Sequence, residues 1–430
     1  MTSADSGDLL DLDVTGIAHG GVSVARHDGR VVFVADAIPG ERVRARVTDA
    51  SKPAFWRAVA VEVPEPSSDR RPHLWAEASI DRDPEARPGG AEFGHIVPRR
   101  QRALKRQVLA EALDRFAGGG VDAPEVAAVS DHDGGWRTRV TLHADADGHV
   151  GPYAARSHRI VPVEDLPLAR PSIAAAARTL RARGEGRVEL VEASDGQVRI
   201  LRKAAAAREG GAGKGARRRA PRAPRPVPEV LVERAAGREF RVDADGFWQV
   251  HPEAADTLDA AVADLLADRV DPDSAHLDLY GGVGLFAATL GRLGARTITT
   301  VESSPRAIAH ARENLGDLGV EAITARVDRF LADRRRDEAA ARAHAGGTVV
   351  LDPPRSGAGR AVVEDVVALA PSAVVYVACD PVAFARDLGT FRARGYDVEE
   401  LRAFDLFPNT HHFEVVARLV PVVGAVASVG

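Results

Sequence analysis

Hydrophobic and polar positions follow two different patterns along the chain, and the change falls near residue 230. Before this point, short runs alternate apolar and polar residues, which is typical of strands with one buried face. After it, continuous apolar runs are followed by longer amphipathic stretches, which is typical of buried parallel strands joined by helices. The pattern therefore predicts a largely antiparallel N-terminal part and an α/β C-terminal part.

The N-terminal residues 9–63 contain five alternating runs separated by Gly-Gly, Asp-Gly and Pro-Gly turns. Five short strands in so few residues predict a small OB-like barrel. Such barrels commonly serve as platforms for single-stranded nucleic acid. The same pattern also suits a purely structural appendage, so both roles stay open.

The middle of the chain is less regular. Residues 64–96 are rich in Pro, Arg and Gly and predict an irregular connection, whereas 103–120 has the periodicity of an amphipathic helix. Between 136 and 201, alternating runs surround a short predicted helix at 172–183. Residues 203–228 are basic and of low complexity, which predicts a disordered insertion that either contacts nucleic-acid phosphates or only aids solubility.

The C-terminal part alternates helices and strands. A helix is predicted at 253–268, and apolar runs predict strands near 277, 297–302, 322–327, 348–352, 374–379 and 413–419. Such alternation favours a doubly wound sheet with helices on both faces. We therefore expect an α/β fold with three domains: a barrel at 1–66, a central α+β domain at 67–235 and the doubly wound domain at 236–430.

A glycine turn lies at the start of the doubly wound domain. The segment HLDLYGGVGLFAATLG (276–291) has the strand, turn and helix of a nucleotide-binding motif, with an acid at Asp278. Glu302 ends the next apolar run, where such folds place a carboxylate on a ribose hydroxyl. The turn alone fits a dinucleotide and S-adenosylmethionine equally well.

Two later strand ends separate these ligands. The segments VVLDPPRSGAG (349–359) and VVYVACDP (374–381) both pass from an apolar run to a polar tip. Ligands of open α/β sheets bind outside such strand ends. An Asp-Pro-Pro tip beside the only cysteine of the chain suits methyl transfer to a base and does not suit hydride transfer.

Cys379 is the candidate nucleophile. It directly precedes a predicted helix, whose N-terminus would lower the pKa of the thiol. Carbon 5 of uracil is a weak nucleophile, and a thiolate added to carbon 6 would activate it. The carbon 5 proton must then leave, and Glu414 is the candidate base. The alternatives are an inert buried cysteine and an exposed edge carboxylate.

Composition excludes several classes of protein. A single cysteine excludes internal disulfides and cysteine-built zinc or iron–sulfur sites. No apolar run is long enough to span a membrane, and the acidic N-terminus does not resemble a signal peptide, so a cytoplasmic location is expected. The net charge of −5 argues against a uniformly basic nucleic-acid binder, and basic residues instead cluster at 97–107 and 202–225.

Four motifs, in order, carry a family resemblance: DLYGGVGLF, VVLDPPRSG, YVACDPVAFARDL and FDLFPNTHHFEVV. Together they resemble the RNA uracil-5-methyltransferase family, which forms 5-methyluridine in transfer and ribosomal RNA. The resemblance covers residues 237–419, and the N-terminal barrel resembles the TRAM domain of many members. It implies a class I methyltransferase fold, S-adenosylmethionine as cofactor and RNA as partner, with no obligate protein partner.

The resemblance also implies residue roles. Cys379 matches the nucleophile and Glu414 the base, and Arg355 would help to shape the uracil pocket. The implied cofactor residues are Gln249, Tyr280, Glu302, Asp328 and Asp352. The target base must leave its stack, and the aromatic candidates for stacking are Trp136, Phe247, Trp248 and Phe407.

Some positions depart from the family pattern. Gly281 replaces a common cysteine, His251 an asparagine, and Asp380 the asparagine after the nucleophile. Asp380 would raise the pKa of the thiol by adding negative charge. The segment of some members that binds an iron–sulfur cluster has become PGGAEFGHI (88–96), so we expect no cluster and no metal.

The sequence thus favours an RNA methyltransferase that forms 5-methyluridine in transfer or ribosomal RNA. The main alternatives are a methyltransferase of the same fold that acts on an exocyclic amine and an RNA-binding protein that has lost catalysis. A dinucleotide-dependent enzyme comes last, because no motif places a catalytic His or Lys.

Overall fold

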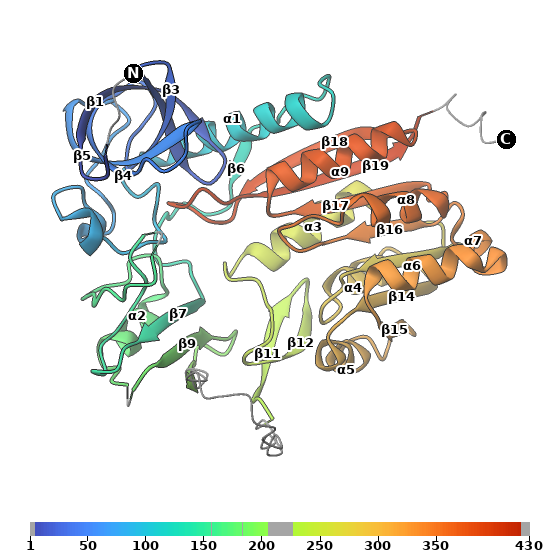
Figure 1. Ribbon diagram of the computed structural model, residues 1–430. Helices are drawn as coiled ribbons and strands as arrows, with labels where there is room; N and C mark the ends of the chain where they lie inside the picture. Colours follow the sequence, from blue (N-terminus) through green and yellow to red (C-terminus); the bar gives the residue numbers. More distant parts are fainter. Residues whose placement is uncertain (1–4, 156, 183, 205–226, 423–430) are drawn as a thin grey trace, which may run out of the picture.

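A computed structural model describes residues 5–155, 157–182, 184–204 and 227–422 (Figure 1). The N-terminal strands form a closed barrel in the order β1-β2-β3-β5-β4. Alternate residues such as Leu12, Val14, Val32 and Val34 fill its interior, which is why the alternating pattern produced it. The predicted barrel is confirmed. Its strands are β1 (Leu9–Ala18), β2 (Val22–His27), β3 (Arg30–Ala35), β4 (Arg42–Asp49) and β5 (Phe55–Glu65).

The central region contains a small antiparallel sheet of order β10-β9-β7-β8, against which helix α2 packs. The predicted irregular connection holds only two short turns of 3₁₀ helix, and the predicted short helix lies at α2. Most of the predicted basic insertion, 205–226, lies outside the described residues. The elements are η1 (Ala76–Ala78), η2 (Pro84–Ala86), α1 (Pro98–Phe116), β7 (Arg139–Ala144), β8 (Val150–Gly151), α2 (Pro171–Arg178), β9 (Gly186–Glu192) and β10 (Val198–Ala204).

The C-terminal part is built on an eight-stranded sheet of order β15-β14-β13-β16-β17-β19-β18-β6. Strands β13 to β17 run parallel, and β19 pairs antiparallel with β17. The strands are β6 (Val126–Ala128), β13 (Ala275–Leu279), β14 (Thr297–Glu302), β15 (Glu321–Thr324), β16 (Thr348–Leu351), β17 (Ala373–Ala378), β18 (Tyr396–Asp405) and β19 (Glu414–Pro421).

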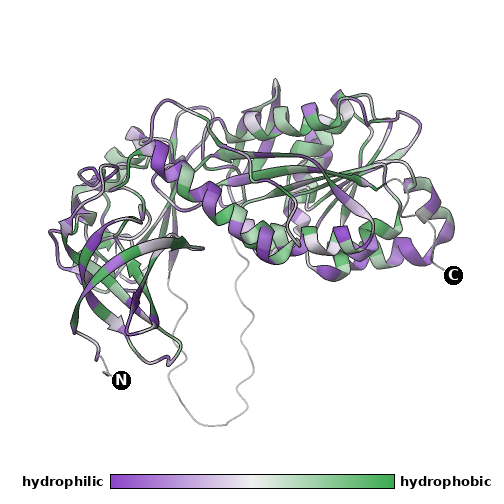
Figure 2. Cartoon of the chain, turned by 90° about the horizontal axis from the view of Figure 1, so that it is seen from above, coloured by the Kyte–Doolittle hydropathy of each residue, from purple (hydrophilic) through white to green (hydrophobic). Residues whose placement is uncertain are grey.

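Helices cover both faces of this sheet, as the doubly wound prediction requires. Leu331 of α6 and Phe384 of α9 belong to the core on one face, and Leu258 of α3 and Phe286 of α4 belong to the core on the other. The preceding hairpin is β11 (Val230–Ala235) and β12 (Arg238–Asp243), and the helices are α3 (Ala254–Leu266), α4 (Leu285–Arg292), α5 (Pro305–Asn314), α6 (Val327–Arg336), α7 (Glu338–His344), α8 (Arg360–Ala368) and α9 (Pro381–Ala393). Figure 2 shows hydrophobic strands between helices whose outer faces are hydrophilic.

Two strands of this sheet were not predicted. Strand β18 is only partly buried and contains a bulge between Val398 and Glu400, so its sequence has no clear apolar run. Strand β6 has three residues and comes from the central region, yet it pairs parallel with β18. The domain limits at residues 66 and 235 stay a prediction. None of the helices in the described part of the chain is long and apolar enough to cross a membrane.

Helix α1 joins the barrel to the large sheet. Leu104 packs with Ile17 and Ile38 of the barrel, whereas Leu109 and Leu113 belong to the core of the large sheet. One amphipathic helix therefore serves two cores, and this fixes the barrel beside the C-terminal domain (Figure 1).

The basic start of α1 is not simply a solvated face. Lys105 is fully buried, and its Nζ donates to Asp405 at 2.6 Å and to the carbonyl of Phe407 at 3.2 Å. This lysine therefore cannot hold an RNA phosphate, whereas Arg99, in the first turn of the helix, is exposed. A buried ion pair is costly to break from one side, because the remaining charge has no water around it.

Replacing Lys105 by Met should destabilise the protein by about 3–5 kcal/mol, because Asp405 would be left buried and unpaired. Urea unfolding followed by circular dichroism measures this loss. Combining Lys105→Met with Asp405→Leu should restore most of the stability, since the pair is then replaced by apolar groups. A single variant as stable as wild type would show that the pair contributes nothing.

Candidate active site

The polar tips predicted from the sequence meet at the carboxyl edge of the parallel strands. Strand β13 pairs with both β14 and β16, and β16 pairs with β17, so the segments that follow these strands lie side by side. This is the edge where open α/β sheets bind ligands. Tyr280, Glu302, Asp352 and Cys379 all directly follow or end one of these strands.

The glycine turn after β13 is shaped for close approach of a ligand. Tyr280 and Gly284 have φ values of +66° and +100°, and helix α4 begins directly after Gly284. A Cβ atom at Gly281 would overlap the Asp278 carboxylate and the Thr300 hydroxyl. Glycine is therefore required at position 281 in this chain, where many family members have cysteine.

Asp278 holds this turn in place through hydrogen bonds to its own carboxylate. Its Oδ2 accepts hydrogen bonds from the Thr300 hydroxyl at 2.9 Å and the Ala287 amide at 3.2 Å. Burial raises the pKa of this carboxyl to about 6. Its Oδ1 is buried and has no partner among the described residues. A bound cationic cofactor would offset this charge, and so the turn fits S-adenosylmethionine, which carries a sulfonium and an ammonium group.

The other predicted cofactor residues lie at different depths. Glu302 ends β14, and its Oε1 accepts from the Ser304 amide at 2.7 Å, which fixes the carboxylate at the strand tip. Asp328 lies in the first turn of α6, where a two-point ion pair with Arg326 lowers its pKa. Gln249 is half-buried on the loop between β12 and α3, and makes no hydrogen bond to another described residue through its side chain.

The Asp-Pro-Pro-Arg loop is held in place by helix α9. The Asp387 carboxylate accepts hydrogen bonds from the Ala358 amide at 2.7 Å and from the Tyr376 hydroxyl at 2.6 Å. Asp352 begins the loop, and its amide donates to the Leu279 carbonyl at 3.3 Å. Burial, and then the negative charge of Asp278, raise the pKa of Asp352 to about 7.

Glu414 lies beside Cys379. The antiparallel register pairs Ala378 with Val415, so the residue after β17 lies next to the first residue of β19. Glu414 is buried, and burial followed by the charge of Asp352 raises its pKa well above its ordinary value. A carboxyl with a raised pKa in a dry site is suited to proton transfer.

Cys379 is half-buried between β17 and α9. Burial, then the negative charges of Glu414 and Asp352, raise the pKa of its thiol to about 12. The prediction that the helix N-terminus would lower this pKa is therefore wrong for the free protein. The predicted effect of Asp380 has the right sign, but the charge of Asp380 contributes less than those of Glu414 and Asp352, and Arg355 acts in the opposite direction.

Asp380 is occupied by two partners. Its Oδ1 caps helix α9 by accepting from the amides of Val382 and Ala383, at 3.1 and 2.8 Å. Its Oδ2 lies 2.8 Å from Nε2 of His19, which belongs to the loop between β1 and β2 of the barrel. The hydrogen bond to Asp380 raises the pKa of His19. The barrel therefore touches the residue directly after the thiol.

The predicted stacking aromatics divide into two groups. Trp136 and Trp248 are buried, and Trp136 stacks on His251 with ring centroids 5.8 Å apart. Phe407 packs edge-on against Trp136 and is partly buried. Phe247 is 76% exposed, so it alone of the four is free to stack on an RNA base.

Comparisons with known proteins agree with this geometry. The family model for tRNA (uracil-5-)-methyltransferase matches residues 234–420, and that for the TRAM domain matches residues 5–61. An uncharacterised RNA methyltransferase of Streptomyces avermitilis is 40% identical, and the alignment covers 96% of this chain and 99% of that one.

The chain belongs to the RNA uracil-5-methyltransferase family.

Two similar proteins have names or titles that give a target uridine. The 23S rRNA (uracil(1939)-C(5))-methyltransferase RlmD of Halomonas elongata is 33% identical, over 96% of this methyltransferase and 89% of that protein. The crystal structure of the Pyrococcus abyssi tRNA (uracil-54, C5)-methyltransferase with S-adenosyl-L-homocysteine matches with a TM-score of 0.68 at 21% identity, covering 95% and 99% of the two chains. That likeness establishes a shared class I methyltransferase fold with an N-terminal barrel.

Three residues of the site were missed by sequence reasoning. His19 lies 361 residues from its partner Asp380, and no local pattern could have joined them. Asp387 falls within a quoted motif, YVACDPVAFARDL, but its role as the anchor of a neighbouring loop depends on how β16 and α9 pack. Thr300 lies inside an apolar strand. Its only signal in the sequence is the glycine at position 281, which leaves room for the Thr300 hydroxyl.

Replacing Glu414 by Gln should lower the pKa of the Cys379 thiol, because the largest single charge effect on it is removed. Alkylation by iodoacetamide, measured against pH, reports this directly, since the chain has one cysteine. Asp380→Asn should lower the pKa less. A thiol that titrates at the same pH in Glu414→Gln as in wild type would contradict the arrangement.

Asp352 should make the cofactor-free protein less stable as pH rises. Its folded pKa is raised to about 7, so the stability present at pH 4 is lost as pH rises through 7. Asp352→Asn should therefore be more stable than wild type at pH 8, by on the order of 4 kcal/mol, and should unfold at a higher temperature; at pH 4 the two should unfold at nearly the same temperature.

Asp380→Asn provides the control of opposite sign. The pKa of Asp380 is lowered, by its hydrogen bonds to His19 and to the Ala383 amide, so its charge stabilises the protein above the ordinary pKa. This variant should lose stability at pH 8. Scanning calorimetry at both pH values measures the two variants, and equal shifts at pH 4 and 8 for Asp352→Asn would refute the charge effect.

Proposed function

We propose that this methyltransferase transfers a methyl group from S-adenosylmethionine to carbon 5 of a uridine in RNA through a covalent adduct with Cys379. The observation that carries the proposal is the meeting of one thiol and two buried carboxyls, Glu414 and Asp352, at the strand ends beside the glycine turn. A transfer to an exocyclic amine would need no thiol and no second proton acceptor.

The cofactor supplies an electrophilic methyl group on a sulfonium. In our proposal Gln249, Tyr280, Glu302 and Asp328 hold it, with Glu302 placed for ribose hydroxyls. Asp352 lies between this position and the thiol. Its raised pKa, about 7, lets it either donate or accept a hydrogen bond at the uracil edge near neutral pH.

The Cys379 thiol first loses its proton to water. The thiolate then forms a bond to carbon 6 of uracil, and the electron pair of the 5,6 double bond moves into an enolate. Carbon 5 would take the methyl group as the bond between this methyl and the sulfonium sulfur breaks, which leaves S-adenosylhomocysteine. Glu414 removes the proton from carbon 5, the 5,6 double bond re-forms, and the thiolate leaves.

Burial and neighbouring charges control when Cys379 and Glu414 ionise. Both Cys379 and Glu414 have raised pKa values in the free protein, so each resists ionisation. Arg355 lowers the pKa of both, and is the cation that favours their charged forms. Bound uracil offers its own polar edge and excludes water, which strengthens this effect.

Ribosomal RNA is the substrate that we place first. The RlmD relative is similar over nearly its whole length at 33% identity, and its name gives a uridine of 23S rRNA. The match to the enzyme that acts on uracil 54 of tRNA is at 21% identity. Transcribed 23S rRNA and transcribed tRNA therefore serve as the two test substrates.

Transcripts that contain 5-fluorouridine should trap the wild-type protein on RNA. Fluorine at carbon 5 cannot leave as a proton, so Glu414 cannot complete the reaction and the bond to Cys379 persists. The measurement is a shifted band on a denaturing gel that requires S-adenosylmethionine and is absent in Cys379→Ala. Methylation by Cys379→Ala at the wild-type rate would instead indicate the exocyclic-amine reaction.

Glu414→Gln should accumulate the adduct on ordinary uridine, because addition and methylation precede the step that needs the base. We expect its turnover to fall by roughly 10²–10⁴-fold, with the methyl group present in the trapped RNA. Wild-type protein that binds RNA and cofactor yet forms neither adduct nor 5-methyluridine would favour a protein that has lost catalysis.

A further inference from the structure

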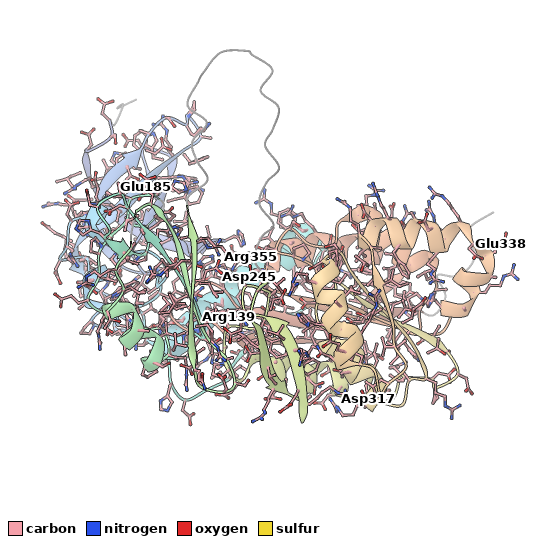
Figure 3. All side chains as sticks on the ribbon, turned by 90° about the horizontal axis from the view of Figure 1, so that it is seen from below. Arg139, Glu185, Asp245, Asp317, Glu338 and Arg355 are labelled. Carbon is pink, nitrogen blue, oxygen red and sulfur yellow. The ribbon has the colours of Figure 1, made fainter. Side chains whose placement is uncertain are left out.

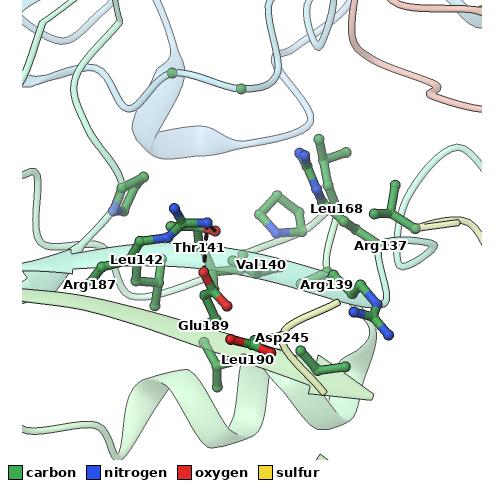
Figure 4. A pocket seen from close by; sticks show the side chains of 18 of the residues that line it. Arg137, Arg139, Val140, Thr141, Leu142, Leu168, Arg187, Glu189, Leu190 and Asp245 are labelled. Atoms are coloured by element: carbon green, nitrogen blue, oxygen red, sulfur yellow. Dashed lines mark hydrogen bonds and ion pairs between the residues drawn. The ribbon is translucent and has the colours of Figure 1, made fainter. Parts of the chain in front are cut away.

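A cavity of about 370 Å³ lies in the central region, outside the residues assigned to catalysis (Figure 4). Strands β7 and β9 form one side of it, and the segments 89–90 and 166–169 form another. Residues 244–246 and Val250, from the loop that leads to the C-terminal domain, complete it. Its volume falls within the range of pockets that hold small organic ligands, roughly 300–1,000 Å³.

The cavity lies along a free strand edge. Strand β8 pairs only with His143 and Ala144 of β7, so in the described structure the stretch 139–142 has no strand on the side opposite β9. A free edge presents main-chain N–H and C=O groups. Apolar side chains including Leu142, Leu168 and Leu190 lie beside this edge (Figure 4). A flat ligand with a hydrogen-bonding rim suits such a surface.

Most charges that line the cavity are already paired. Arg187 lies 2.7 Å from Glu189, and Arg139 lies 3.2 Å from Glu233 and also donates to two carbonyls. Asp245 lies 3.4 Å from Lys203. Because these charged side chains pair with one another, they offer few free hydrogen-bonding groups to a ligand.

Arg137 is the exception. Its guanidinium makes no ion pair or hydrogen bond with a described residue, and its Nε is buried without a partner. Its backbone is fixed, because its amide donates to the Leu168 carbonyl at 2.7 Å and its carbonyl accepts from the Arg170 amide at 2.9 Å. A guanidinium whose buried Nε has no hydrogen-bond partner is a ready site for an anion, and phosphate is the anion that RNA supplies.

Arg137 also connects the cavity with the catalytic loop. The negative charge of Glu92 and, more weakly, the positive charge of Arg355 act on Arg137. Arg355 also acts on Cys379 and Glu414, so it lies between the cavity and the thiol. Figure 3 shows Arg139, Asp245 and Arg355 at the junction between the central sheet and the C-terminal domain. Neither guanidinium forms a close ion pair in the described part of the chain, so one phosphodiester would give both a hydrogen-bonding counter-ion that Glu92 and Glu414 do not supply.

We propose that this cavity binds one unstacked nucleotide of the substrate RNA that flanks the target uridine. Its base lies against the free edge of β7, and the phosphate on the side of the target lies between Arg137 and Arg355. This inference rests on the proposed function, since the target uridine must lie at Cys379. The cavity would then help to choose which uridine is methylated, because a base that does not fit would misplace the phosphate.

The first test combines RNA lacking single bases with a variant that fills the cavity. The probe is the RNA fragment on which wild-type protein forms 5-methyluridine, with each nucleotide within three of the target made abasic in turn. One flanking position should weaken binding to wild type by roughly tenfold, as expected for the loss of a bound base. Filling the cavity by Thr141→Trp, at an exposed position of β7, should weaken binding to intact RNA similarly and make that abasic site harmless.

The matched control is Thr179→Trp, at an exposed position directly after α2 and outside the cavity. It should behave as wild type. If Thr141→Trp lost affinity but stayed sensitive to the same abasic site, or if no flanking abasic site affected the wild-type protein, the cavity would not hold a base. Binding of S-adenosylmethionine by each variant, measured by calorimetry, shows that the fold is intact.

The second test needs no bulky residue. Arg137→Gln should weaken RNA binding by roughly tenfold or more and lower the slope of log K against log salt by about 0.7–0.9, the contribution of one phosphate contact. Arg178→Gln, an exposed arginine paired with Asp165, is the control and should leave the slope unchanged. An unchanged slope in Arg137→Gln would overturn the phosphate assignment.

The two proposals fail in different ways. Wild-type protein that forms no 5-methyluridine on any transcript removes the proposed function, and the cavity proposal with it. Wild-type protein that methylates RNA, but shows neither the abasic effect nor the change of salt slope, keeps the function and removes the cavity proposal alone.

Discussion

The cost of placing three acidic groups together in a dry site governs this protein. Cys379, Glu414 and Asp352 lie at neighbouring strand ends. The charges of Glu414 and Asp352 raise the pKa of Cys379, and the charge of Asp352 raises that of Glu414. Parallel strands bring their carboxyl ends to one edge, and the antiparallel β19 brings Glu414 to the same edge from the opposite direction. The fold thus gathers groups that repel one another when charged, and Arg355 is the nearby cation that reduces the repulsion. A bound cationic cofactor would offset the negative charge that these groups gain when they ionise.

The barrel and the catalytic domain are joined more closely than a string of domains would be. Helix α1 shares its apolar face between both, strand β6 from the central region extends the large sheet, and His19 of the barrel touches Asp380. Each contact lies close to the thiol or to the strands that carry it. The barrel therefore lies at a fixed distance and orientation from the thiol, and RNA held on the barrel would be presented to the site in one fixed arrangement.

The sequence predicted the elements that have a strong local pattern. Strands β13, β14, β16 and β17 are largely buried on both faces and read as nearly continuous apolar runs, and the barrel strands alternate cleanly, so both groups were predicted. Strand β18 is half-polar and bulged, and β6 is too short for any period to show. Motifs singled out Cys379 and Glu414, and the structure brings them together, but their catalytic roles stay a prediction. Their pKa shifts were not predicted, because a sequence shows a helix N-terminus after Cys379 but not the burial and the carboxyls that raise its pKa. The unpaired guanidinium of Arg137 is invisible for the same reason, since a missing partner is a property of the packed structure.

The protonated state of Cys379 has a consequence for the lifetime of the enzyme. Peroxides and disulfides react with thiolate rather than thiol, so a thiol with a pKa near 12 is a poor target for oxidation while it waits for RNA. The sequence has no second cysteine that could rescue an oxidised one by forming an internal disulfide. The burial and negative charge that oppose ionisation of Cys379 in the free protein therefore also protect its thiol from oxidation.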